Sequence, residues 1–189
     1  MSTAALKVLY TADDLLTMSD GDRYELVRGG LVEKEMSEES NLIAGWIAYL
    51  LNAFILPKRS GFVIPEQTYR CFPDDPNKVR RPDISFLRAE RRPAGPLRHG
   101  HTPDAPDLAV EVVSPNDVAY DLEEKLADYR SAGVPLIWVV FPNRRTVHVY
   151  AGGSEVPSVL HESDPLTGGE ILPGFSVKVA DLFPATVSS

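Results

Sequence analysis

The chain has 189 residues, of which 43% are hydrophobic and 24% are charged, a composition that predicts a globular protein with one substantial core. Its single cysteine, Cys71, excludes an intrachain disulfide and a cysteine-rich zinc framework. The formal charge of −8 argues against broad, non-specific affinity for nucleic acid, because lysine and arginine supply most of that binding.

Export and membrane insertion are not expected. The first ten residues lack the basic start and long apolar stretch of a signal peptide. The most apolar segment, residues 42–56, contains Asn52 and is shorter than the roughly 20 residues of a membrane-spanning helix. We therefore expect a cytoplasmic protein.

The chain begins with signals for a short helix and a hairpin. Thr11 and Asp14 form the pattern of a capping box, with aspartate in place of the usual glutamate. Residues 24–27 and 31–36 then flank Arg28-Gly29-Gly30, which is typical of a β-hairpin.

A long helix and a β-rich middle segment follow. Apolar residues recur at helical spacing from Ser37 to the stop at Pro57. Strands are then predicted at residues 62–64, 68–72 and 84–87, separated by turns rich in proline and aspartate. A loop that is expected to be exposed and mobile extends over residues 88–106.

The second half alternates strands with one helix. The run 108–113 predicts a buried strand, and residues 114–117 offer caps for a helix over 118–132 that Gly133 closes. The remaining strands are predicted at residues 136–141, 146–150, 158–161 and 175–179. This order predicts one α/β (α+β) domain over residues 1–189, with its core at about 11–183 and a mixed sheet flanked by helices.

Glu111 is a carboxylate within an otherwise apolar strand. Successive strand residues point to opposite faces, so Glu111 shares a face with Ala109. Burying such a group is costly without a partner or a metal. Either a metal site or a structurally satisfied acid explains it.

Lys125 lies inside the apolar arc of the following helix, which also contains Leu122, Leu126 and Tyr129. A lysine there either extends its ammonium to solvent, pairs with Asp121, or meets a buried carboxylate.

The third candidate is Asp83, which follows Pro82 at the predicted entrance of the strand over residues 84–87. An aspartate, a glutamate and a lysine at one edge suit metal-dependent phosphodiester hydrolysis. Two carboxylates supply hard oxygen ligands for Mg²⁺, with Mn²⁺ as the alternative. The metal activates a bound water, and the lysine orients that water or stabilises developing charge.

Several strings resemble the Uma-two family of restriction endonucleases, a branch of the PD-(D/E)XK nuclease superfamily. They are YELVRGGLVEKEMS, RPDISFL, PDLAVEVVSPND, DLEEKLADYRSAGVPLIWVVFPNRRTVHVY and LPGFSVKVADLF, and they span about Thr11 to Phe183.

The resemblance implies a restriction-endonuclease-like sheet core, with Asp83 and Glu111 as the motif acids. Val113 stands where the superfamily has lysine, and the family resemblance implies that Lys125 on the next helix replaces it. The family also often shows Gly-Glu in the first hairpin and a histidine early in the long helix, where this chain has Gly30 and, approximately, Ser40. Two further acids, Glu25 and Glu66, are candidates for an accessory role.

Basic residues cluster between Lys78 and Arg98, where seven basic and two acidic residues give a local charge of +5. Such a run is either a solvated surface or an edge that faces phosphate. The nucleic-acid-binding candidates within it are Arg80, Arg81, Arg88, Arg91 and Arg92.

The sequence therefore predicts a Mg²⁺-dependent endonuclease that acts on DNA. Two alternatives stay open: a non-catalytic module that binds nucleic acid or protein, and a hydrolase for small phosphoesters. A homodimer is also expected if both DNA strands are cut, with the strand that carries Trp138 and Phe141 as a candidate interface.

Overall fold

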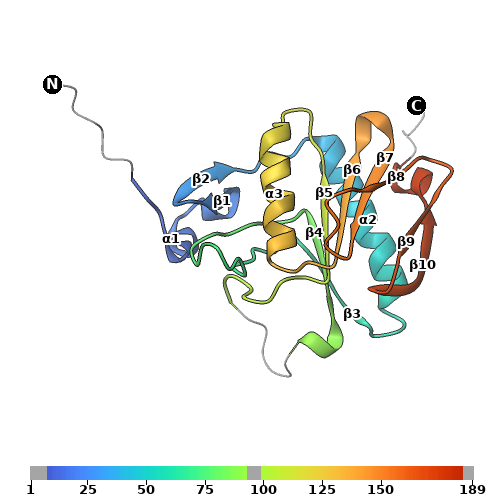
Figure 1. The fold of residues 1–189 in the computed structure, drawn as a ribbon, viewed down its shortest axis with the longest axis horizontal. Coiled ribbons are helices and arrows are strands. Elements are labelled where there is room, and N and C mark those ends of the chain that lie inside the picture. Colours follow the sequence, from blue (N-terminus) through green and yellow to red (C-terminus); the bar gives the residue numbers. More distant parts are fainter. Residues whose placement is uncertain (1–7, 93–98, 185–189) are drawn as a thin grey trace.

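A computed structural model describes residues 8–92 and 99–184, and its centre is a mixed six-stranded sheet (Figure 1). The strand order is β3-β4-β5-β6-β7-β8. Only β5 and β6 in this sheet run parallel, and its other neighbours are antiparallel. The bounds are β3 Gly61–Pro65, β4 Ile84–Arg88, β5 Leu108–Val112, β6 Leu136–Phe141, β7 Thr146–Ala151 and β8 Ser158–Leu160.

Two layers cover the sheet, so the predicted mixed sheet flanked by helices is confirmed. The helix α3 (Ala119–Ser131) connects β5 to β6 and lies on one face. The helix α2 (Glu38–Ile55) covers the opposite face together with the hairpin β9 (Pro165–Gly168) and β10 (Leu172–Lys178).

Alternation along β5 assigns its side chains to these two layers. Val110 packs into the core with Ile47 of α2, whereas Ala109 packs with Leu126 of α3. Glu111 lies two residues after Ala109 and therefore faces the α3 side. The face that the sequence predicted for Glu111 is thus the face beside the lysine helix.

The N-terminal hairpin packs beside the sheet. Here α1 (Ala12–Thr17) begins at the predicted capping box of Thr11, and β1 (Tyr24–Val27) pairs with β2 (Gly30–Glu33). Arg28 and Gly29 both have positive φ, as the two central residues of a tight hairpin turn require. Reciprocal backbone hydrogen bonds join Leu26 to Val79 and hold this hairpin against residues 79–81.

Two strand predictions differ from the structure. Residues 68–72 form no strand, because Tyr69 makes only isolated bridges, to Arg80 and to Thr102. The positive φ of Glu66 turns the chain away after β3, and the Tyr69 side chain packs with the α3-side core instead of extending the sheet. The strand β9 was not predicted, because Pro165 and Gly168 weaken its strand pattern.

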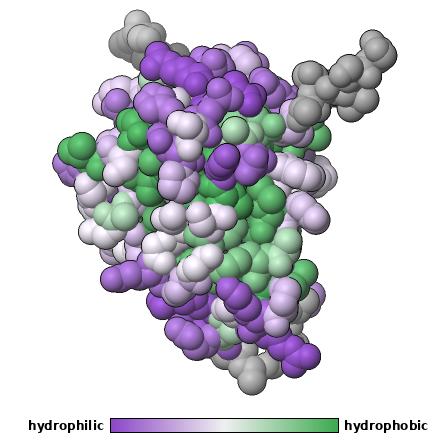
Figure 2. All heavy atoms as spheres, turned by 90° about the vertical axis from the view of Figure 1, so that its right-hand side faces the viewer, coloured by the Kyte–Doolittle hydropathy of each residue, from purple (hydrophilic) through white to green (hydrophobic). Residues whose placement is uncertain are grey.

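The predicted dimer interface on residues 136–141 is wrong for Trp138. The strand β6 lies between β5 and β7, and Trp138 is 0% exposed and stacks on Phe175. The side of the molecule where Figure 1 shows β9 and β10 instead carries an apolar patch among hydrophilic residues (Figure 2). None of the helices within residues 8–92 and 99–184 has the length and apolar character needed to cross a membrane.

Candidate active site

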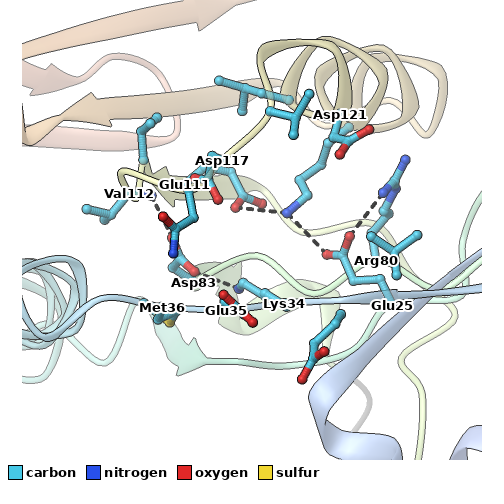
Figure 3. A pocket seen from close by; sticks show the side chains of 17 residues that line it. Glu25, Lys34, Glu35, Met36, Arg80, Asp83, Glu111, Val112, Asp117 and Asp121 are labelled. Atoms are coloured by element: carbon cyan, nitrogen blue, oxygen red, sulfur yellow. Dashed lines mark hydrogen bonds and ion pairs between the residues drawn. The ribbon is translucent and has the colours of Figure 1, made fainter.

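A pocket of about 280 Å³ opens where the N-terminal hairpin, residues 80–83, the end of β5 and the start of α3 meet. Asp83, Glu111 and Lys125, the three residues that the sequence assigns to catalysis, all line it. Figure 3 shows the carboxylates of Asp83, Glu111 and Glu25 in this pocket, with Lys34 beside Asp83. The fold therefore gathers two lysines and three acids from segments that are far apart in the sequence.

The pairing of β4 with β5 places Asp83 beside Glu111. Ile84 pairs with Val110, so the same antiparallel register continued by one residue sets Asp83 opposite Glu111, on the same face of the sheet. The Val112 N–H donates to Asp83 Oδ2 at 2.5 Å. This hydrogen bond fixes one oxygen of the Asp83 carboxylate and leaves Oδ1 directed toward the Lys34 ammonium, 2.6 Å away.

Glu111 receives donors from α3 on both of its carboxylate oxygens. The Tyr129 hydroxyl donates to Oε1 at 2.6 Å, and Lys125 Nζ donates to Oε2 at 3.3 Å. Burial raises the pKa of Glu111, Lys125 lowers it and the charge of Asp83 raises it, with a net value of about 7. The Glu111 carboxyl therefore changes charge near neutral pH when no metal is bound.

Lys125 bridges two carboxylates. Its Nζ lies 3.3 Å from Glu111 Oε2 and 3.4 Å from Glu25 Oε1. Burial lowers the pKa of Lys125, but the charges of Glu111 and Glu25 more than offset this and raise it. Of the interpretations left open for Lys125, the structure shows the contact with a buried carboxylate.

Glu25 belongs to a second layer of ion pairs behind Lys125. Its Oε1 accepts the Arg81 N–H at 2.7 Å, and its Oε2 lies 3.0 Å from Arg80 Nη1. Burial raises the pKa of Glu25, but Lys125, Arg80 and Lys34 together hold it near 2. Glu25 is therefore ionised and holds Lys125 in place, which suits a positioning role.

Glu66 lies outside the pocket lining, with 39% of its side chain exposed. It pairs with Lys34 at 3.0 Å and with Arg81 at 3.1 Å. Glu66 is therefore connected to Asp83 through Lys34, whereas Glu25 lines the pocket and contacts Lys125 directly.

The predicted basic edge is largely engaged by acids. Arg80 and Arg81 are 2% and 8% exposed, and their guanidinium groups pair with Glu25 and Asp128, and with Glu66, respectively. Burial leaves neither group facing solvent, so neither suits direct contact with nucleic acid. Arg88 and Arg91 both pair with the buried Asp107, Arg92 lies over the ring of Phe62, and Arg98 lies outside the described residues.

Two residues that contact the pocket acids were not assigned to the site from the sequence. Tyr129 belongs to the same apolar arc as Lys125, one turn later, so its shared face was a signal that the hydroxyl faces Glu111. Lys34 gave no such signal, because it follows β2 in an alternating acidic and basic run, and only the docking of the hairpin brings it to Asp83.

The donor set in the pocket fits a divalent cation that prefers oxygen. The described residues contain no group of three or more histidine, cysteine, aspartate or glutamate side chains that could hold a metal ion. Mg²⁺, however, commonly binds through one or two carboxylates and keeps several waters. Asp83 Oδ1 and Glu111 Oε2 are carboxylate oxygens in contact with the ammonium groups of Lys34 and Lys125, and the charge of Asp83 raises the pKa of Glu111, so a cation between the two carboxylates would offset their mutual repulsion.

The mixed sheet and its two covering layers define an α/β protein with an acidic pocket at the end of β5. The chain matches the Uma2 family model, described as "Putative restriction endonuclease", over residues 12–180, and it belongs to this family.

Among solved structures, the chain is similar to a protein described as a putative nuclease belonging to DUF820, from Anabaena variabilis ATCC 29413. The TM-score is 0.76 and the identity is 21%, and the match covers 92% of this chain and 97% of that one. This likeness shows the fold. No curated protein matches the chain.

Proposed function

We propose that the protein is a Mg²⁺-dependent endonuclease that hydrolyses phosphodiester bonds in DNA. One observation carries the proposal: Asp83, immediately before β4, and Glu111, on the adjacent strand β5, line one pocket, and the Lys125 ammonium lies 3.3 Å from Glu111. Family membership supports nuclease chemistry for this arrangement. Asp83 and Glu111 would hold the metal, and Mn²⁺ would serve in its place.

The bound metal would lower the pKa of a water and neutralise charge on the phosphate. Lys125 would then orient that water or stabilise the developing charge, because its ammonium protons face the carboxylate that would hold the metal. Glu25 positions Lys125 from behind. Tyr129 fixes the rotamer of Glu111 through its hydroxyl. Each of these groups is preorganised by buried partners, so little rearrangement accompanies the reaction.

A second candidate, a hydrolase for small phosphoesters, is favoured by the charge around the pocket. Four exposed acids line its rim and would repel a polyanion that approaches without metal. Two of the basic residues expected to bind DNA, Arg80 and Arg81, are buried. The rim acids are Glu33, Glu35, Asp117 and Asp121.

The test is cleavage of supercoiled plasmid in Mg²⁺ or Mn²⁺ by the wild type and by Asp83→Asn, Glu111→Gln and Lys125→Met. A matched control is Asp107→Asn, which changes a fully buried acid outside the pocket. The proposal expects nicking by the wild type and by the control, and loss in all three pocket variants. Equal activity in all variants would contradict the site.

The same proteins are assayed on bis(p-nitrophenyl) phosphate to separate the two candidates. Hydrolysis of this small diester with no plasmid nicking would replace the endonuclease by the small-phosphoester hydrolase. Inactivity on both substrates, with retained DNA binding, would favour the non-catalytic module.

A further inference from the structure

Lys34 occupies a nest of oxygens beside Asp83. Its Nζ lies 2.6 Å from Asp83 Oδ1, 2.6 Å from the Arg81 carbonyl oxygen and 3.0 Å from Glu66 Oε1. Only 8% of the Lys34 side chain is exposed. An ammonium that contacts three oxygens is surrounded as a small cation would be, and one of those oxygens belongs to a proposed metal ligand.

Each buried acid of the pocket already contacts a lysine. Lys34 Nζ lies 2.6 Å from Asp83, and Lys125 Nζ lies 3.3 Å from Glu111 and 3.4 Å from Glu25. A divalent ion placed between Asp83 and Glu111 would lie beside these ammonium groups, and like charges repel strongly at low dielectric. Metal binding is therefore favoured when one resident cation moves away from the acids.

Lys34 is the cation best placed to leave. Arg80 is held by Glu25 and Asp128 and is 2% exposed, and Lys125 is held between Glu111 and Glu25. Lys34 is the cation that contacts Asp83 itself. Its second acidic partner, Glu66, is 39% exposed, so the ammonium can move outward and keep an ion pair.

We infer that Lys34 is a resident counter-ion of the metal-free site, which holds the Asp83 carboxylate in place and is displaced toward Glu66 when a divalent cation binds. Competition by Lys34 then sets the metal affinity of the site. This inference rests on the proposed function only in taking Asp83 as a metal ligand.

The test is calorimetric titration of Mn²⁺ into the wild type and Lys34→Met, together with thermal melting in EDTA and in Mn²⁺. Lys34→Met is expected to bind Mn²⁺ about tenfold more tightly or better, because a like charge within a few ångströms of the ion is removed. In EDTA, the melting temperature of Lys34→Met is expected to be lower than that of the wild type, because the Asp83 charge is uncompensated. Mn²⁺ is then expected to raise the melting temperature of the variant by more than it raises that of the wild type.

A matched control is Lys78→Met. Lys78 is a second buried lysine, paired with Asp74 and Asp128 outside the pocket. Its loss is expected to lower the melting temperature with no extra recovery in Mn²⁺. Lys34→Gln, which keeps hydrogen-bond donors for the Arg81 carbonyl, provides the same titration if Lys34→Met does not fold.

Mn²⁺ affinity in Lys34→Met that is equal to or weaker than in the wild type, or absent in both, would overturn the inference. Failure of the nuclease proposal gives a different result. In that case Lys34→Met gains Mn²⁺ affinity, and Asp83→Asn abolishes it, although the wild type cleaves neither plasmid nor small diester.

Discussion

Lys125 donates to Glu111 across 3.3 Å, from the helix that follows the strand on which Glu111 lies. The same ammonium lies 3.4 Å from Glu25. Replacing Lys125 by methionine therefore leaves two buried carboxylates without their shared cation. We expect Lys125→Met to lose plasmid cleavage and to lower the free energy of unfolding by about 3–5 kcal/mol in EDTA. Urea denaturation measures the second effect, and an unchanged midpoint would show that the pair contributes nothing.

The Tyr129 hydroxyl is expected to matter for metal binding as well as for stability. Tyr129→Phe keeps the buried ring and removes only the hydrogen bond to Glu111. Tyr129→Phe should lower the free energy of unfolding by about 1–3 kcal/mol. It should also bind Mn²⁺ more weakly than the wild type, because Glu111 loses its fixed orientation.

Tyr69→Phe provides the matched control for that change. Tyr69 is also buried, and its hydroxyl donates to Ser85 Oγ at 2.7 Å, outside the pocket. Tyr69→Phe should lower the free energy of unfolding by about as much as Tyr129→Phe does, but its affinity for Mn²⁺ should equal that of the wild type. If both variants bind Mn²⁺ like the wild type, the orienting role of Tyr129 is wrong.

Glu111 is expected to make metal-free stability fall as pH rises toward neutral. Its pKa is raised from 4.5 to about 7 in the folded protein, chiefly by burial. Between these values the native state binds more protons than the unfolded state, so the free energy of unfolding decreases with rising pH. Between pH 5 and pH 8 in EDTA, ionisation of Glu111 should lower the free energy of unfolding by up to about 3 kcal/mol.

The Glu111→Gln variant isolates this contribution, because glutamine does not titrate. Urea denaturation at several pH values should show a smaller decrease in the variant than in the wild type. Parallel pH profiles for the two proteins would contradict the raised pKa.

Two arginines of the basic stretch should behave differently in DNA binding. Arg92 is partly exposed over Phe62, whereas Arg80 is buried between Glu25 and Asp128. Arg92→Gln should weaken DNA binding and reduce the slope of log affinity against log salt by about 1. Arg80→Met should lower stability by about 3 kcal/mol or more, because its acids lose their cation.

Binding titrations at several salt concentrations measure the first effect, and urea denaturation measures the second. An unchanged salt slope in Arg92→Gln would exclude a phosphate contact by that side chain.

The strand and helix periodicities predicted the local part of the site. Alternation along residues 107–113 placed Glu111 on the same face as Ala109, and the helical arc placed Lys125 among the apolar residues of its helix, because both depend only on spacing within one element. The roles assigned to these residues stay predictions.

What the sequence did not predict depends on contacts between distant segments. Lys34 reaches Asp83 only because the β1–β2 hairpin docks on residues 79–81. Arg80 was expected to be exposed for the same reason: its acidic partners, Glu25 and Asp128, lie 55 residues before it and 48 residues after it.

The central claim, that Asp83 and Glu111 hold a divalent metal, is tested most directly by diffraction from a crystal soaked in Mn²⁺. Anomalous scattering locates the ion without relying on activity. We expect one strong anomalous peak within coordination distance of both carboxylates, and its loss in Asp83→Asn. A peak elsewhere, or no peak in this pocket under conditions in which the protein cleaves plasmid, would contradict the proposed site.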